Sequence, residues 1–324
     1  MRLVERYRPA TLDDIVGQEE NIKSIRGVIA RMKAGEAGPH FLFLGPPGTG
    51  KTSTATCMAR ELYGDQWSRH FKEFNASDAR KIEDVRTRYK PISRHVGNRI
   101  LFLDEADRMT SDAQHAMRRI MEQTPSTIFV LSGNQGWKII DAIKSRCAIY
   151  RFKRLDDRSI AKRLTQIIEA EDIKVDLKDP DIRKGLTLLV KESHGDMRYA
   201  LNTLEKLVTG DKEITPEAVL MLRRPKLAVD AMMKALAGDF QGGKELMENA
   251  FITGGFSVES VIEELYEGLV KVEDEQVRVR LYRELGEVED RCKRGNPIIQ
   301  LVSFVAYVWV APRLMKCPAA EGER

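Results

Sequence analysis

An eight-residue glycine-rich motif, GPPGTGKT, constrains this 324-residue chain more than any other feature. It occupies residues 45–52 and fits the pattern G-x-x-x-x-G-K-[ST] at every fixed position. The apolar run HFLFL precedes the motif and a helical pattern follows it, which is the context that a phosphate-binding loop requires. Its glycines let backbone N–H groups surround phosphate oxygens, while its lysine supplies a positive charge and its threonine a hydroxyl for Mg²⁺. A chance Gly/Pro turn would not explain both flanking elements.

Four more apolar runs alternate with helical patterns in the first part of the chain. The five runs cover residues 40–45, 70–76, 99–104, 127–132 and 147–152. Helical patterns occupy residues 50–64, 78–90 and 111–123. Strands that alternate with helices predict an α/β domain over residues 1–153, with a parallel sheet covered on both faces.

Only helical patterns follow residue 152. Apolar residues recur at three- and four-residue spacing over 157–172, 180–193 and 197–208, which predicts a small helical domain over 154–225. A third, all-helical domain is predicted over 226–324, with breaks at Gly242-Gly243, Gly254-Gly255 and Gly295-Asn296-Pro297. Its apolar run 298–311 is shorter than the roughly 20 residues of a membrane span, so it indicates a buried helix or a subunit interface.

The net charge of +4 is unevenly distributed. Lys and Arg number 41 against 32 Asp and Glu up to residue 226, and 12 against 17 after it. This asymmetry points to an anionic partner for the first part of the chain. Six basic residues against two acidic ones lie between Arg80 and Arg94, and rows of basic groups suit a nucleic-acid backbone. A solvated helix face is the alternative for any single residue.

Cysteine usage excludes two kinds of stabilising site. The four cysteines form no CxxC pair, so neither a disulfide scaffold nor a zinc ribbon is expected, and a reducing compartment is the simple interpretation. The charged start MRLVERYRPA does not resemble a signal peptide.

Acidic residues end the third apolar run, which reads LFLDEAD. A buried strand would deliver Asp104 and Glu105 to the carboxyl edge of the sheet, where open α/β sheets bind ligands. Asp104 is then placed to hold Mg²⁺ and Glu105 to polarise an attacking water. An acidic loop after a core strand is the alternative, which the phosphate-loop motif makes less attractive.

Three more polar residues are candidates for a nucleotide site. Asn134 ends the fourth run, where its amide can orient the same water, although Asn between glycines is also common in turns. Arg146 precedes the fifth run and can reach a neighbouring subunit's nucleotide or neutralise a helix C-terminus. Arg198 opens a helix and can reach a bound nucleotide or remain a surface arginine near Asp196.

Seven segments follow one another along the chain: VERYRPATLDDIVGQ, GPPGTGKT, FNASDARKI, LFLDEAD, the strand end at Asn134, SRC and GDMR. Together they resemble the small-subunit family of replication factor C, the sliding-clamp loader of archaea and eukaryotes within the AAA+ ATPases. The resemblance covers nearly the whole chain and is most specific in its first 200 residues. It implies a P-loop AAA+ parallel-sheet domain, a helical lid domain and an all-helical collar domain that mediates oligomerisation.

The resemblance also implies an activity and its site. The expected protein is an ATPase that uses ATP and Mg²⁺, within a pentamer of one large and several small subunits, to open the sliding clamp and load it onto primer–template DNA. The residues expected to bind ATP are Tyr7, Arg8, Pro9, Val16, Gly17, Gly45, Pro46, Pro47, Gly48, Thr49, Gly50, Lys51 and Thr52. Metal ligation is expected from Thr52 and Asp104, and catalysis from Lys51, Glu105 as base, Asn134 and Arg198 as nucleotide sensors, and Arg146 as a finger acting on the neighbour's ATP. DNA contact is expected from Arg80, Lys81 and Arg86.

The chain departs from the family pattern in places. It reads NASDARKI where NASDERGI is usual, which replaces a glycine by Lys81 at the expected DNA face, and SGNQ where SCNY is commoner. These changes suggest a divergent paralogue. No clamp-docking motif of the form Q-x-x-[LI]-x-x-[FY]-[FY] occurs, which argues against a large subunit.

Two alternative functions stay open at this point. A scaffold subunit that no longer hydrolyses ATP would be expected to have lost Glu105 or Lys51, and both are present. Another DNA-associated AAA+ machine, such as a branch-migration motor, would be expected to carry a C-terminal winged helix, whereas the last 98 residues show no clear β-hairpin pattern. We expect a location in the archaeal cytoplasm at the nucleoid, or in the nucleus if the source is eukaryotic, and no membrane partner.

Overall fold

The computed structural model describes residues 2–76, 83, 85, 87, 99–209, 213–222, 226–252 and 257–314. The chain divides into two compact units, Met1–Arg223 and Arg224–Arg324. Most of the helix predicted over 78–90 lies outside the described residues, and so do the predicted DNA contacts Arg80, Lys81 and Arg86. The division into three domains at residues 153 and 225 stays a prediction.

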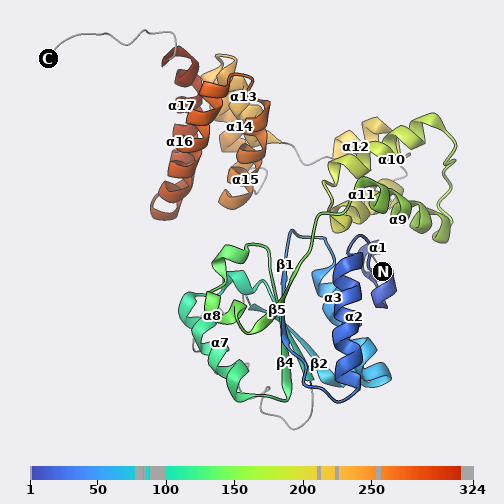
Figure 1. Cartoon of the computed structure of the whole chain (residues 1–324). Coiled ribbons are helices and arrows are strands. Elements are labelled where there is room, and N and C mark those ends of the chain that lie inside the picture. Colours follow the sequence, from blue (N-terminus) through green and yellow to red (C-terminus); the bar gives the residue numbers. More distant parts are fainter. Residues whose placement is uncertain are drawn as a thin grey trace. The chain divides into compact units, whose positions relative to one another are not determined.

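A parallel five-stranded sheet forms the centre of the first unit (Figure 1). Its strands are β1 (His40–Leu44), β2 (Phe71–Asn75), β3 (Arg99–Asp104), β4 (Thr127–Gly133) and β5 (Cys147–Arg151), in the order β2-β3-β4-β1-β5. All four neighbouring pairs are parallel. The predicted runs therefore form the strands, each within one residue at either end.

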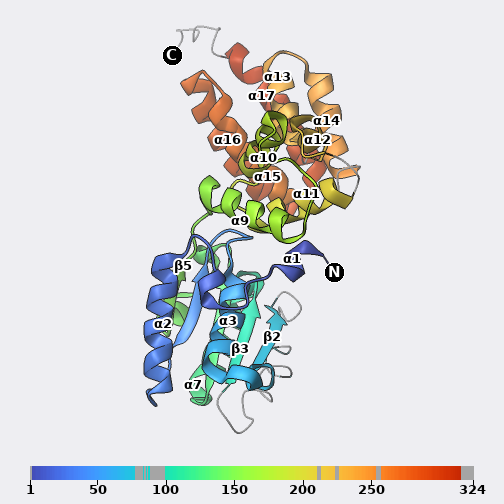
Figure 2. The ribbon, with the colours of Figure 1, turned by 90° about the vertical axis from the view of Figure 1, so that its right-hand side faces the viewer.

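Helices cover both faces of this sheet. Alternate residues of the central strands, such as Phe41 and Phe102, pack toward α2 (Glu19–Lys33) and α3 (Lys51–Tyr63), which face the viewer in Figure 2. The residues between them, such as Leu42 and Leu103, pack with α7 (Ser111–Gln123) and Ile143 of α8 (Asp141–Lys144). Because strand side chains alternate between faces, a strand buried on both sides needs a continuous apolar run, which is what the sequence contains.

Short elements connect these layers. They are α1 (Leu3–Arg6), η1 (Leu12–Asp14), η2 (Gly64–Gln66), α4 (Trp67–His70), η5 (Ala106–Arg108) and η6 (Gly136–Lys138). The helix α4 occupies the residues just before β2, so His70 ends a helix instead of starting the strand.

Four helices with their own core complete the first unit. They are α9 (Asp157–Ala170), α10 (Pro180–Glu192), α11 (Met197–Thr209) and α12 (Pro216–Leu222). Asp156 caps α9 by accepting from the Ser159 amide at 2.7 Å, and Asp179 caps α10 with Pro180 in its first turn. Leu3 of α1 is buried in the same core, so the N-terminal segment is anchored on this bundle.

The described part of the second unit, residues 226–252 and 257–314, contains only helices among its regular elements, as predicted. It contains α13 (Leu227–Leu236), α14 (Phe240–Ile252), α15 (Val258–Gly268), η7 (Leu269–Lys271), α16 (Glu275–Arg294) and α17 (Pro297–Leu314). The predicted break at 295–297 separates α16 from α17. Residues 254 and 255 lie outside the described residues.

The predicted break at Gly242-Gly243 is wrong, because α14 runs through both glycines. Asp239 accepts from the Gly242 amide at 2.8 Å and so supports the start of the helix. A Cβ on Gly243 would lie 2.7 Å from the carbonyl oxygen of Ala231, so glycine here permits α14 to approach α13 closely. The glycine pair thus serves helix packing and does not end a helix.

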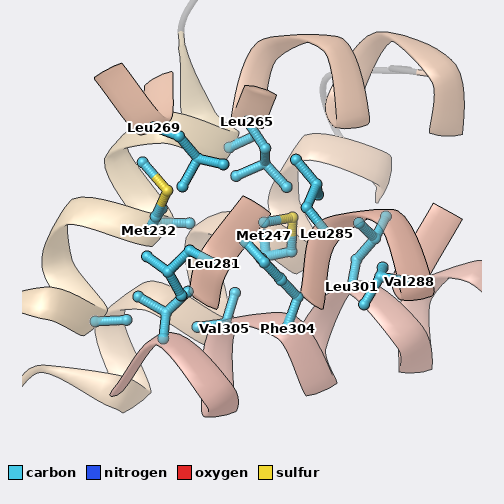
Figure 3. Packing of buried hydrophobic residues seen from close by; sticks show 14 of the residues in the cluster. Met232, Met247, Leu265, Leu269, Leu281, Leu285, Val288, Leu301, Phe304 and Val305 are labelled. Atoms are coloured by element: carbon cyan, nitrogen blue, oxygen red, sulfur yellow. The ribbon is translucent and has the colours of Figure 1, made fainter. Parts of the chain in front are cut away.

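The apolar run 298–311 forms most of α17, and its core face is buried. Leu301, Phe304, Val305, Val308 and Ala311 have no exposed surface. They pack among residues of the other helices, with Met232, Met247, Leu265, Leu269, Leu281, Leu285 and Val288 in the same cluster (Figure 3). One face of the run is thus a buried helix face, and the interpretation as a subunit interface stays a prediction. In the part of the chain that the structure describes, no helix has the length and apolar character needed to cross a membrane.

Candidate nucleotide-binding site

The glycine-rich loop connects β1 to α3 at the carboxyl edge of the sheet. Gly48 and Gly50 have φ angles of +69° and +98°, a region that favours glycine. Lys51 is the first residue of α3, and only 8% of it is exposed. Its Nζ donates to the carbonyl oxygens of Gly45 at 2.6 Å and Pro46 at 2.7 Å. The loop thus folds around the lysine ammonium group.

Burial lowers the pKa of Lys51 to about 8. Asp104 and Asp107 act in the opposite direction, and Arg198 acts with the burial. The contacts of the ammonium are mostly neutral acceptors, including Asn134 Oδ1 at 2.9 Å. Its positive charge is therefore poorly compensated, which suits a group that is to receive an anion.

The two predicted metal ligands lie side by side. Thr52 Oγ1 donates to Asp104 Oδ2 at 3.2 Å. The other carboxylate oxygen, Oδ1, accepts from the Ser132 hydroxyl and from the Glu105 amide, the latter at 3.1 Å. Asp104 ends β3 and Ser132 lies in the adjacent β4, so the sheet register holds the carboxylate in place. Ser132 is a supporting residue that no sequence motif marks.

Glu105 has an unusual backbone conformation for a residue with a side chain. Its φ of 57° and ψ of 39° place it in the left-handed region. Residues held there cost about 1–3 kcal/mol and occur often at functional sites. Its Oε2 lies 3.3 Å from Nε of Arg108, and Glu105 itself lines the cleft. The turn directs the chain away from β3 immediately after Asp104, the predicted metal ligand.

Asn134 follows β4 and is held by a carboxylate. Asp107 Oδ2 accepts from the amides of Asn134 at 3.1 Å and Gln135 at 2.9 Å. Asp107 is 9% exposed and ends the sequence LFLDEAD. Asp107 is the third acid of this motif, and the sequence alone suggests no role for it. Because Asp107 fixes the backbone at Asn134, the Asn134 side chain can keep its hydrogen bond with Lys51.

A cleft of about 460 Å³ extends from the loop to the N-terminal segment. Its wall includes most of the residues predicted to bind ATP, namely Tyr7, Arg8, Pro9, Val16, Pro47, Gly48, Thr49, Gly50, Lys51 and Thr52. Asp104, Glu105, Asn134 and Arg198 line the same cleft. Gly17, Gly45 and Pro46 are not in its wall. A Cβ on Gly17 would lie 2.8 Å from Leu155 Cδ2, so this glycine permits a close approach beside the cleft.

The helical bundle contributes an arginine that the sequence did not reveal. Arg163 of α9 lines the cleft, and its guanidinium donates to the Tyr7 carbonyl oxygen at 3.3 Å. It also lies 5.9 Å from the centre of the Tyr7 ring. On the sequence Arg163 is one of many charges on an amphipathic helix, so no local pattern could have identified it.

Arg146 does not belong to the cleft of its own chain. It lies between α8 and β5, where its Nε donates to Glu122 Oε1 at 2.8 Å and its guanidinium also donates to the Ala142 carbonyl oxygen at 2.8 Å. These contacts hold the side chain on α7 and α8. It is not in the wall of the cleft in which this chain would bind nucleotide.

Comparisons with known proteins identify the family of the chain. The model of the ATPase family associated with various cellular activities (AAA) matches residues 41–155, and that of the replication factor C C-terminal domain matches residues 224–307. The replication factor C small subunit of Archaeoglobus fulgidus is 38% identical over 316 residues, which cover 94% of this chain and 96% of that protein. The Haloarcula marismortui small subunit is 40% identical over 313 residues, covering 94% and 93%.

Solved structures show a related fold. Thermotoga maritima RuvB, a Holliday junction branch migration motor, aligns with a TM-score of 0.55 and 17% identity, over 80% of this chain and 85% of that one. At this identity the likeness shows the fold alone. The relatives that are similar in sequence over nearly their full length decide the family: this chain belongs to the replication factor C small subunits and is an AAA+ ATPase subunit of that clamp loader.

Proposed function

We propose that the first unit binds ATP with Mg²⁺ in the cleft, and that ATP binding and hydrolysis there drive the opening of a sliding clamp and its loading onto primer–template DNA. One observation carries the proposal. Lys51, Thr52, Asp104, Glu105 and Asn134 come from three separate segments of the sequence and meet in a single cleft.

The loop and its lysine would bind the phosphates. The Lys51 ammonium now donates to carbonyl oxygens of its own loop, and phosphate oxygens would replace these neutral acceptors. Charge-assisted hydrogen bonds are roughly twice as strong as neutral ones, so this exchange favours the bound state. Tyr7, Arg8, Pro9 and Val16 would enclose the base at the other end of the cleft.

Mg²⁺ fits the oxygens present. Thr52 Oγ1 and Asp104 Oδ2 are hard ligands 3.2 Å apart, and Mg²⁺ typically takes one or two protein oxygens together with phosphates and waters. Among the described residues there is no cluster of three or more His, Cys, Asp or Glu side chains that would form a dedicated metal cage. When bound, the ion supplies neutralisation of the phosphate charge.

Hydrolysis needs a base and an orienting group. Glu105 would accept a proton from the attacking water, and the Asn134 amide would orient that water while keeping contact with Lys51. Arg198 would contact phosphate from the helical bundle. Arg146 would act on the ATP of a neighbouring subunit, since its own cleft does not contain it.

The partners follow from the family. We propose a pentamer with a replication factor C large subunit and other small subunits, held together by the second unit as a collar. The sliding clamp and primer–template DNA would be its substrates, with Arg80, Lys81 and Arg86 on the DNA backbone.

The test is co-purification of this chain with a candidate large subunit and clamp, followed by ATPase assays. We expect ATPase activity that primed DNA and clamp stimulate together. Lys51→Ala should abolish nucleotide binding at this subunit's site, and Glu105→Gln should preserve binding but lower turnover by about 10²–10⁴. Unchanged turnover with Glu105→Gln would support the scaffold alternative. ATPase activity that responds to DNA but ignores the clamp would support another AAA+ machine.

A further inference from the structure

A tight turn between α10 and α11 contacts two parts of the sheet domain at once. This turn, residues 193–197, contacts the segment that leaves β5 through two hydrogen bonds. The Leu155 amide donates to the Gly195 carbonyl oxygen at 3.2 Å, and the Arg154 guanidinium donates to the His194 carbonyl oxygen at 2.7 Å. Gly195 has a φ of +82°, and a Cβ there would lie 2.6 Å from Arg154 Cβ. The turn is therefore fixed on the connection between the sheet and the helical bundle.

The same turn rests on the phosphate loop. The Met197 amide donates to the Gly48 carbonyl oxygen at 3.3 Å. A Cβ built on Gly48 would lie only 1.7 Å from Asp196 Oδ1 and 2.3 Å from its Cγ. The Asp196 carboxylate thus occupies the space that any side chain at position 48 would need. Gly48 stands at a variable position of the phosphate-loop pattern, so contact with the bundle gives a reason for glycine that the pattern does not.

Asp196 is a fixed negative charge at this place. Its Oδ1 accepts from the Tyr199 amide at 3.0 Å, which caps α11 and keeps the carboxylate from rotating away. Asp196 also raises the pKa of Lys51, whereas Arg198, two residues later, lowers it. The bundle therefore places opposite charges, two residues apart, within electrostatic reach of the loop lysine.

We propose that Asp196 is a positioning residue that seats the helical bundle on the phosphate loop through Gly48 and, by its negative charge, limits the affinity of the loop for nucleotide phosphates. This inference rests on ATP binding in the cleft. Arg198 contributes attraction, Asp196 contributes repulsion, and the balance sets how tightly nucleotide is held. A machine that must release its nucleotide in each cycle gains from such a limit.

The two effects of Asp196 can be separated by substitution. Asn is as good a helix cap as Asp and has nearly the same shape, so Asp196→Asn keeps the contact with Gly48 and removes only the charge. Asp196→Ala removes the cap and the contact as well. For like charges roughly 7 Å apart and an effective dielectric constant of about 35–50, between the protein-surface and bulk-water values, loss of one repulsive charge should strengthen nucleotide binding about five- to tenfold.

The experiment measures the dissociation constant of a fluorescent ATP analogue with the purified full chain, at 50 and 300 mM salt. Asp156→Asn is the matched control, because Asp156 caps α9 in the same way, accepting from the Ser159 amide, but unlike Asp196 is not among the charges that shift the pKa of Lys51. We expect Asp196→Asn to bind five- to tenfold more tightly at low salt, with a smaller gain at high salt, and Asp156→Asn to match the wild type. Amide hydrogen exchange of Met197 and Tyr199 should be unchanged in Asp196→Asn and faster in Asp196→Ala.

Each result has a distinct meaning. Binding by Asp196→Asn that equals or falls below the wild type would overturn the electrostatic role. Unchanged Met197 exchange in Asp196→Ala would overturn the seating role. Equal gains in nucleotide affinity for Asp196→Asn and Asp156→Asn would show that the effect comes from the overall charge of the helical bundle and would overturn the specific role of Asp196. Lys51→Ala serves as a separate check, since undiminished binding in that variant would refute ATP binding at the loop itself and not the role of Asp196.

Discussion

The loop lysine should make nucleotide binding depend on pH in a range where lysines usually do not titrate. Burial holds the pKa of Lys51 at about 8 in the nucleotide-free chain. Phosphate stabilises the charged ammonium, so binding raises this pKa. Below pH 8 the lysine is already charged and affinity should be constant. Above pH 8 the neutral form must first take up a proton, and affinity should fall.

The magnitude follows from the fraction of charged lysine. With a pKa of about 8, about nine in ten molecules carry the charge at pH 7 and about one in eleven at pH 9. The dissociation constant should therefore rise about tenfold between these values, equivalent to about 1.4 kcal/mol. The thiols of Cys57 and Cys147 do not interfere, because burial raises the pKa of each to about 12.

The assay is titration calorimetry with ATP and Mg²⁺ from pH 7.0 to 9.5, in pairs of buffers with different ionisation enthalpies. At pH 8.5 binding should take up about 0.8 proton, since about that fraction of Lys51 is neutral there. Lys51→Arg is the control, because arginine remains charged throughout and its slope should be flat even if its affinity is lower. A constant dissociation constant up to pH 9.5, or the same slope in Lys51→Arg, would refute the reasoning.

Three further substitutions test the supporting structure. Asp107→Ala removes the acceptor for the backbone amides of Asn134 and Gln135. It should lower turnover of the assembled ATPase at least tenfold, while the nucleotide dissociation constant changes less than twofold. A larger change in the dissociation constant would contradict this role of Asp107. Leu3→Ala should destabilise the first unit by about 2–4 kcal/mol in a denaturant titration, and Leu3→Met by less than about 1.5 kcal/mol. Equal destabilisation by the two variants would show that Leu3 is not buried in the bundle core. Glu122→Gln weakens the contact that holds the Arg146 side chain, so it should lower turnover of the complex several-fold and leave this chain's own ATP affinity unchanged. The free energy of unfolding should change by no more than about 1 kcal/mol, because the Arg146–Glu122 pair is partly exposed.

The strands and the phosphate loop could be predicted because their signals are local. A strand buried on both faces needs an unbroken apolar run, and the loop needs glycines and a lysine at fixed spacing. The helix beginnings predicted at residues 157 and 180 match those of α9 and α10, whose caps act within three residues of their own positions. The prediction of a break at Gly242-Gly243 was wrong, because a glycine pair is typical both of a turn and of a close contact between helices. Only the folded structure, in which α14 packs against α13, shows that the second case applies.

The candidate site was predictable only in part. Motifs identified the residues expected to touch ATP, because those residues cluster on short segments after strands. They did not identify the residues that hold them. Asp107 supports Asn134 across 27 positions, Ser132 holds Asp104 across 28, and Arg163 reaches Tyr7 across 156.

The sequence by itself determined that this chain would build a parallel sheet with a phosphate loop and place acids at the carboxyl edge, because apolar periodicity and loop geometry are local properties. It also determined the all-helical character of the remainder. Only the tertiary structure decided that Lys51 would be buried with a lowered pKa, that Arg146 would lie outside its own cleft, and that Asp196 would rest on Gly48. Burial, charge balance and close approach depend on which distant segments meet, and that information exists only once the chain is folded.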